Sequence, residues 1–258
     1  MQLQALSAFA DNYIWLLPND ENTAVVVDPG EAGPVFAAAD AGLWIGAVLL
    51  THHHHDHIGG VPALLERWPG LPVFAPDDPR IAVPATPVGD GDRLRATGFE
   101  FEVIAVPGHT SSHVAYYGAG IGDGVLFSGD TLFSLGCGRL FEGSPLQMHQ
   151  SLSRLARLPG STSLYCGHEY TLSNAAFARV VEPENAPLLR RTQEAQDMRD
   201  ASRPTLPSTL ASELASNPFL RCDQPAVIAA VQRRLGRVPT DAVEVFAELR
   251  HWKDGFSG

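Results

Sequence analysis

The chain has 258 residues, 45% of them hydrophobic, and a formal net charge of -11 at pH 7. Such a composition is typical of a globular protein with a substantial core, and the negative charge argues against nucleic acid or an anionic membrane as a partner. No apolar run approaches the ~20 residues of a membrane span, and the first residues lack a signal-peptide pattern. The three cysteines have no paired spacing. We therefore expect free thiols and a cytoplasmic protein.

The first 170 residues alternate strand-like and helical segments. Strands are expected where β-branched and aromatic residues gather, at Tyr13–Leu17, Ala24–Val27, Ala47–Leu50, Val73–Ala75, Phe99–Val106, Val114–Tyr117, Val125–Ser128 and Leu164–Cys166. Helices are expected over 59–68 and, with Ser144 as the N-cap, over 145–158. After residue 170 the strand patterns end, and the sequence predicts helices at Glu184–Arg199, Gln224–Leu235 and Pro239–Trp252. We therefore predict a mixed α/β domain over residues 1–170 and a smaller helical domain over 171–258.

The densest chemical signal is a histidine-rich run directly after the apolar segment Ala47–Leu50. It reads His52-His53-His54-His55-Asp56-His57. The pattern His-x-His-x-Asp-His places imidazole and carboxylate ligands at the end of a predicted strand, which suits zinc, iron or manganese. Alternation along an extended segment puts His52 and His54 on one side and turns His53 and His55 away. A solvated histidine-rich loop is the alternative.

Three further strand-like segments end in a glycine, and a potential ligand follows close behind. These ligands are His109, Asp130 and His168. Glycine permits a sharp turn that aims the next side chain, and strands lying side by side would bring their ends to one sheet edge. Seven ligands are too many for one tetrahedral metal but suit two. We expect His52, His54 and His109 on one ion, Asp56, His57 and His168 on the other, and Asp130 bridging. His113 is expected to orient a ligand rather than to bind metal.

This order of ligands resembles that of the metallo-β-lactamase superfamily, and further motifs resemble glyoxalase II, the hydroxyacylglutathione hydrolases. The match extends over nearly the whole chain, with motifs at Phe9–Trp15, Val106–Ser111, Ser128–Phe133, Gly136–Gly143, Tyr165–Thr171, Asn217–Arg221 and Arg250–Phe256. The resemblance implies an αββα sandwich with a smaller C-terminal α-helical domain that helps to form the glutathione site. It also implies hydrolysis of S-D-lactoylglutathione and related 2-hydroxyacylglutathiones, the second step of methylglyoxal detoxification.

Substrate contacts are also implied by the resemblance. In the family, basic residues at the positions of Arg250 and Lys253 bind the glycine carboxylate of glutathione. Lys253 is the single lysine among 18 basic residues, which fits a role that a compact ammonium serves better than a guanidinium. Incidental charges on a solvated helix are the alternative. The other implied contacts are Arg139, Phe141, Tyr170 and Asn174. Arg139 stands where some relatives have lysine, and Phe141 where some have tyrosine.

The expected reaction is attack of a metal-bridging hydroxide on the thioester carbonyl, with Asp56 and Asp130 as the carboxylates of the catalytic centre. The cofactors would be two divalent metal ions, zinc before iron or manganese, and the partner a small-molecule glutathione thioester bound by a monomer. Alternatives on the same scaffold are a persulfide dioxygenase with a single iron, a lactonase and a β-lactamase. A non-catalytic binding module would be expected to lack ligands, and nucleic-acid processing would need a basic surface.

Overall fold

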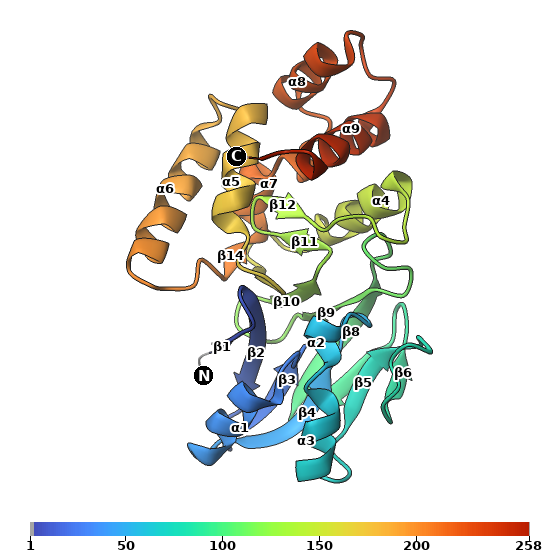
Figure 1. The fold of residues 1–258 in the computed structure, drawn as a ribbon, viewed down its shortest axis with the longest axis vertical. Coiled ribbons are helices and arrows are strands. Elements are labelled where there is room, and N and C mark those ends of the chain that lie inside the picture. The colour runs from blue at the N-terminus through green and yellow to red at the C-terminus, as the bar shows by residue number, and fades with distance from the viewer. Residues whose placement is uncertain (1–2, 258) are drawn as a thin grey trace. The chain divides into compact units, whose positions relative to one another are not determined.

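The computed structural model describes residues 3–257, and the chain forms two compact units (Figure 1). Unit 1 contains the residues up to Ala105, together with Ser112–Gly129 and Tyr165–His168. Unit 2 contains Val106–Ser111, Asp130–Leu164 and the residues from Glu169 onward. The units interleave along the sequence, so they are a different division from the domains expected over 1–170 and 171–258, which stay a prediction.

The first sheet of unit 1 has strands in sequential order. It consists of β1 (Gln4–Ala8), β2 (Asn12–Pro18), β3 (Thr23–Val27), β4 (Trp44–Leu49), β5 (Val73–Pro76) and β6 (Thr86–Val88). The pairs β1–β2 and β2–β3 are antiparallel, and the strands from β3 to β6 pair in parallel. Parallel pairs need a crossover connection, and here α1 (Ala32–Asp40) and α3 (Val61–Arg67) provide the first two.

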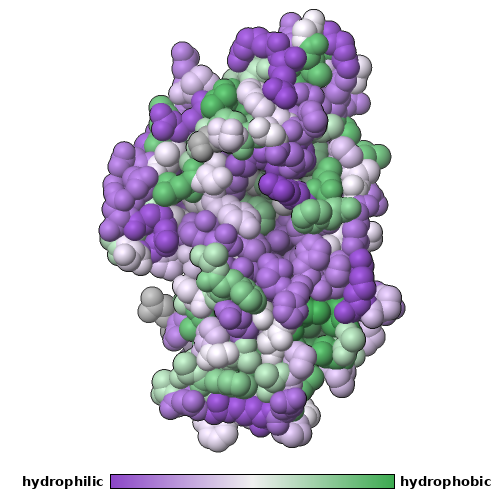
Figure 2. Space-filling model, in the orientation of Figure 1, coloured by the Kyte–Doolittle hydropathy of each residue, from purple (hydrophilic) through white to green (hydrophobic). Residues whose placement is uncertain are grey.

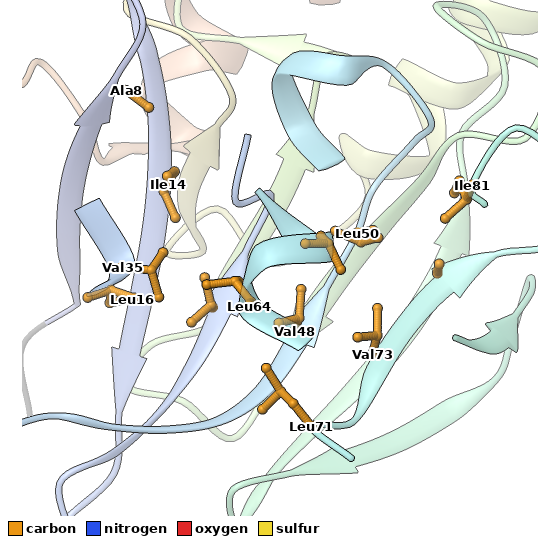
Figure 3. Close-up of a cluster of buried hydrophobic side chains, with 13 residues drawn as sticks. Ala8, Ile14, Leu16, Val35, Val48, Leu50, Leu64, Leu71, Val73 and Ile81 are labelled. Carbon is orange, nitrogen blue, oxygen red and sulfur yellow. The ribbon is translucent and has the colours of Figure 1, made fainter. Parts of the chain in front are cut away.

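The helices bury their apolar side chains against this sheet. Figure 3 shows Val35 of α1 and Leu64 of α3 among Leu16, Val48 and Val73 of the strands, and all five are buried. Strands of a parallel sheet that is covered in this way have continuously apolar sequences. This is why Ala24–Val27 and Ala47–Leu50 could be recognised as strands from sequence.

A second sheet lies in unit 1. It contains β7 (Arg93–Ala96), β8 (Phe99–Ala105), β9 (Val114–Gly118) and β10 (Val125–Gly129), joined antiparallel, with β13 (Ser163–Cys166) next to β10. The buried Tyr116 of β9 donates its hydroxyl to the Leu50 carbonyl oxygen at 2.8 Å, at the end of β4. The two sheets of unit 1 therefore face each other.

Unit 2 is mainly helical. It contains α4 (Pro145–Leu155), α5 (Thr171–Val181), α6 (Ala186–Asp200), α7 (Leu210–Ser216), a 3-10 turn (Pro218–Leu220), α8 (Pro225–Leu235) and α9 (Ala242–Asp254). Two short strands, β11 (Leu132–Phe133) and β12 (Gly136–Cys137), form a hairpin, and β14 (Ser208–Thr209) pairs with Ser163 and Leu164. Leu135, Ala175, Ala178 and Leu188 form a buried apolar cluster. The outer surface of α6 is mainly hydrophilic (Figure 2).

Most strands and helices expected from sequence are present, and the Ser144 N-cap of α4 is confirmed. Its hydroxyl accepts from Gln147 N, and the Gln147 side chain accepts from Ser144 N, which makes a capping box. Two expectations are wrong. A strand, β14, does occur after residue 170, but its two residues are too few to show alternation. The four strands that precede the ligands do not share one sheet, because β4 lies in the first sheet and β8, β10 and β13 in the second. Within residues 3–257, no helix is long and apolar enough to cross a membrane.

Candidate metal centre and substrate contacts

Unit 1 brings three of the predicted ligands to one point. Ligand atoms of Asp56, His57 and His168 lie within 4.8 Å of one another. Asp56 Oδ2 is 3.5 Å from His57 Nε2 and 3.4 Å from His168 Nε2. Asp56 and His57 lie on the short helix α2 (His55–Ile58), while His168 follows β13 by two residues. Segments more than 100 residues apart thus supply a compact set of nitrogen and oxygen donors.

Carboxylates hold the second ring nitrogen of both histidines. Asp28 Oδ2 lies 3.0 Å from His57 Nδ1, and Asp11 Oδ1 lies 2.8 Å from His168 Nδ1. Each imidazole therefore directs its Nε2 towards Asp56. Carboxylate–histidine pairs of this kind orient the ligands of metal sites and increase their basicity. The chemistry of this donor set fits a divalent metal.

Asp28 also fixes the backbone just before the histidine run, and Asn12 fixes the carboxylate of Asp56. The buried Asp28 accepts hydrogen bonds from Thr51 N at 2.8 Å and Thr51 Oγ1 at 2.7 Å, just before the histidine run. Asn12 Nδ2 donates to Asp56 Oδ2 at 3.0 Å. Sequence reasoning missed Asp11, Asn12 and Asp28. A weaker signal was present for Asp28, because it directly follows the predicted strand Ala24–Val27, although no glycine precedes it as one precedes His109, Asp130 and His168.

Two further predicted ligands lie together in unit 1. His52 Nε2 is 3.0 Å from His54 Nδ1. The His52 ring is buried, and its Nδ1 lies 3.1 Å from Thr51 Oγ1. The ring of His113 stacks on that of His52 at 4.6 Å with an interplanar angle of 17°. His53 has a different neighbour, since its Nδ1 lies 3.6 Å from Asp78 Oδ2.

Unit 2 brings the other two predicted ligands together. His109 Nε2 is 3.4 Å from Asp130 Oδ2, and both residues are buried. The carbonyl oxygen of Arg139 lies 2.9 Å from His109 Nδ1, so a backbone oxygen orients this ring. Gly138 allows the close approach, because a Cβ there would lie 1.9 Å from the Asp130 carbonyl oxygen. The Cys-Gly-Arg segment thus supports the ligand pair through its backbone.

The basic residues of α9 differ in their surroundings. Arg250 is buried, and its Nη1 donates to the Cys137 carbonyl oxygen at 2.8 Å. Lys253 Nζ is nearer solvent and donates to the Ser173 carbonyl oxygen at 3.1 Å. Partial burial, with the nearby charges of Arg250 and Arg139, lowers the pKa of Lys253 to about 8. Unit 2 therefore holds a basic cluster of Lys253, Arg250 and Arg139, in which Asp254 Oδ1 lies 3.0 Å from Arg250 Nη2 and 3.8 Å from Arg139 Nε.

The remaining candidate contacts lie on or beside the β11–β12 hairpin. Asn174 Nδ2 donates to the Ser134 carbonyl oxygen at 3.1 Å. Tyr170 packs edge-on against Phe133, with ring centroids 5.3 Å apart. Phe141 is 63% exposed, and its ring lies 5.2 Å from that of His109. An exposed aromatic ring beside a candidate metal ligand is suited to contact a substrate bound there.

Two facing sheets with helical cover, and the ligands at the strand ends, define a protein of the metallo-β-lactamase class. A family model described as "Metallo-beta-lactamase superfamily" matches residues 9–168, and one described as "Hydroxyacylglutathione hydrolase C-terminus" matches residues 169–256. A relative named hydroxyacylglutathione hydrolase, from Xanthomonas euvesicatoria pv. vesicatoria (strain 85-10), is 60% identical over 257 residues, 99% of each chain. A relative of the same name from Stenotrophomonas maltophilia (strain R551-3) is 56% identical over 99% of each chain. The chain therefore belongs to the hydroxyacylglutathione hydrolase family of this superfamily.

Solved structures agree on the fold. The BLEG-1 B3 metallo-β-lactamase matches with a TM-score of 0.65 and 26% identity, over 85% of this chain and 99% of that one. TTHA1623 in a di-iron-bound form matches with a TM-score of 0.54 and 32% identity, over 65% of this chain and 92% of that one. ETHE1 from Myxococcus xanthus has a TM-score of 0.64 at 24% identity, over 99% of this chain and 100% of that one, which shows the fold alone. The predicted αββα fold with a C-terminal helical part is confirmed.

Proposed function

We propose that the protein is a metal-dependent thioesterase that hydrolyses S-D-lactoylglutathione, and related 2-hydroxyacylglutathiones, to glutathione and the free acid. The observation that carries the proposal is the oriented donor set Asp56, His57 and His168, in a chain whose 60% identical relative is named hydroxyacylglutathione hydrolase. We further propose a cytoplasmic monomer acting in methylglyoxal detoxification. The free, buried thiols of Cys137, Cys166 and Cys222 support a reducing compartment.

We propose that seven residues hold two divalent metals, with zinc preferred over iron or manganese. His52, His54 and His109 would bind one ion, Asp56, His57 and His168 would bind the other, and Asp130 would bridge them. Imidazole and carboxylate donors suit all three metals. A di-iron-bound form of the 32% identical TTHA1623 supports a binuclear site. When bound, the metals supply Lewis acidity and bring the pKa of a coordinated water towards neutrality.

The chain's own residues prepare this site in three ways. Asp28, Asp11 and the Arg139 carbonyl oxygen hold the outer nitrogens of the ligand histidines, so that little rearrangement accompanies metal binding. Asn12 keeps one oxygen of Asp56 in a fixed direction. Asp56 and Asp130 are the proposed catalytic carboxylates. The thiol of glutathione has a pKa near 8.5. Its thiolate can therefore leave without a general acid, and we assign no residue to that role.

The substrate would be bound mainly by unit 2. We propose that Lys253, with Arg250 and Arg139 near it, attracts the glycine carboxylate of glutathione, and that Tyr170 and Asn174 add contacts. The positive cluster acts locally in an acidic protein, because salt screens charges more than about 8 Å away. Phe141 has no hydroxyl and so offers the substrate apolar contact only.

The direct test is turnover of S-D-lactoylglutathione by the purified protein before and after metal removal. We expect hydrolysis that is lost with the metal and restored by zinc. His168→Ala should lose it as well, whereas His149→Ala, on α4 and 6.0 Å from the Phe246 ring, should retain it. A protein that is fully loaded with metal and does not turn over would contradict the glutathione assignment. Lactones, β-lactams and persulfides would then be the next substrates.

A further inference from the structure

The β11–β12 hairpin occupies a particular position in the sequence. It lies between Asp130, a proposed metal ligand, and Arg139 and Phe141, proposed substrate contacts. Its turn contains Leu135 with φ +59° and a fully buried side chain. A left-handed conformation is strained for a residue other than glycine. It persists only where the surroundings hold it, so the contacts that hold this turn are significant.

Side chains from later in the chain bind the hairpin through its backbone. Asn217 Nδ2 donates to the carbonyl oxygens of Phe133 and Gly136 at 3.1 and 3.0 Å. Asn174 and Arg250 bind the Ser134 and Cys137 carbonyl oxygens, as described above. Glu213 Oε2 accepts from Leu135 N at 2.7 Å. Backbone groups along the whole hairpin thus depend on side chains from the helical part of unit 2.

Glu213 is the centre of this network. Its side chain is fully buried and accepts three hydrogen bonds besides that of Leu135 N: from Ser134 Oγ at 2.9 Å, Ser208 Oγ at 2.5 Å and Asn217 Nδ2 at 3.2 Å. Burial raises the pKa of Glu213, and the hydrogen bonds from Ser208, Leu135 N and Ser134, together with the charge of Arg191, oppose that rise. Arg191 is itself buried and reaches Ser134 Oγ at 3.3 Å. Only a group with two acceptor oxygens can satisfy all four donors.

We propose that Glu213 is a positioning residue for the reaction. Its carboxylate holds the Ser134–Leu135 turn directly and both hairpin strands through Asn217. The hairpin then keeps Asp130 on one side, and Arg139 and Phe141 on the other, in a fixed geometry. The kinetic consequence rests on the proposed function, whereas the structural consequence, a hairpin rigid only when Glu213 is present, stands independently. A displacement of about 1 Å in such groups can lower a rate by about a hundredfold.

The test compares Glu213→Gln with a matched control, Glu182→Gln. Glu182 is also buried in unit 2 and accepts from Arg221 Nε at 2.9 Å and Nη2 at 3.1 Å, away from the hairpin. Amide hydrogen exchange over residues 131–141 and steady-state kinetics at equal metal content are measured for both variants, well below their melting temperatures. Glu213→Gln should exchange faster in the hairpin and lose about tenfold or more in kcat/KM. Glu182→Gln should lower Tm and change neither readout.

Ser134→Ala is a second and milder variant, to be used if Glu213→Gln does not fold. It removes one donor to Glu213 without burying an unpaired charge, so we expect a smaller change of the same kind in both readouts. Hairpin exchange and kcat/KM like those of wild type in the folded variant would overturn the inference. If the wild-type protein does not hydrolyse the thioester, the proposed function fails alone. Hydrogen exchange over 131–141 would then still decide whether Glu213 holds the hairpin.

Discussion

Replacing Asp11 by alanine tests whether carboxylates outside the ligand set prepare the metal site. Asp11 lies in the short link between β1 and β2, with 40% of its side chain exposed, and its Oδ1 is 2.8 Å from His168 Nδ1. Losing such a partner typically lowers metal affinity about 10- to 100-fold, or about 1.4–2.8 kcal/mol. Because water can reach the position of Asp11 and replace part of the interaction, we expect the lower end, about tenfold.

Competition with a zinc chelator measures this change. Titration of the apoprotein should show one of two bound metals weakened about tenfold and the other unchanged, since Asp11 contacts only His168 among the proposed ligands. Asp20→Ala is the control, because it removes one exposed acidic charge from the β2–β3 turn, outside the candidate metal centre. If Asp11→Ala binds both metals as wild type does, or if both sites weaken equally, Asp11 does not prepare the His168 site.

Three further predictions concern substrate affinity, the Cys-Gly-Arg segment and stability. Lys253→Ala should raise KM for a glutathione thioester about fivefold, or about 1 kcal/mol for a half-exposed ion pair. Because the pKa of Lys253 is about 8, its ammonium is lost above that pH, and the wild-type KM should rise there. Lys253→Arg stays charged, so a KM–pH profile of this variant should lack the rise. Gly138→Ala should lower kcat/KM and metal content about tenfold or more, because its Cβ would clash with the Asp130 backbone. The control Gly33→Ala, where the Cβ meets nothing within 4 Å, should change neither quantity. Ser144→Ala should lower Tm by about 2–4 °C in a thermal melt, since an N-cap contributes about 1 kcal/mol, with unchanged kinetics.

The sequence predicts local features of the site well, because they depend on neighbouring residues. Gly129 before Asp130 and Gly167 before His168 indicate strand ends that turn sharply; Gly129 is the last residue of β10, and Gly167 directly follows β13. The Ser144 cap could be recognised for the same reason, since its partner Gln147 is three residues away. Features of this kind need only backbone geometry and short spacing.

Contacts between distant segments could not be predicted in this way. Asp11 and His168 are 157 residues apart, and no local pattern relates them. The sequence also predicts Asn174 and Arg250 as substrate contacts through family resemblance only. Their hydrogen bonds to the hairpin backbone depend on how α5 and α9 pack, which composition and periodicity do not determine. For the same reason Glu213, in a helix of seven residues, carries no sign in the sequence of being fully buried.

A zinc titration of the apoprotein, with metal binding and S-D-lactoylglutathione hydrolysis followed on the same samples, tests the binuclear thioesterase most directly. We expect two zinc ions to bind per chain and hydrolysis to rise to its maximum only as the second one binds. Full activity at one zinc per chain, or two bound zinc ions without hydrolysis, would show that the protein is not a binuclear zinc thioesterase.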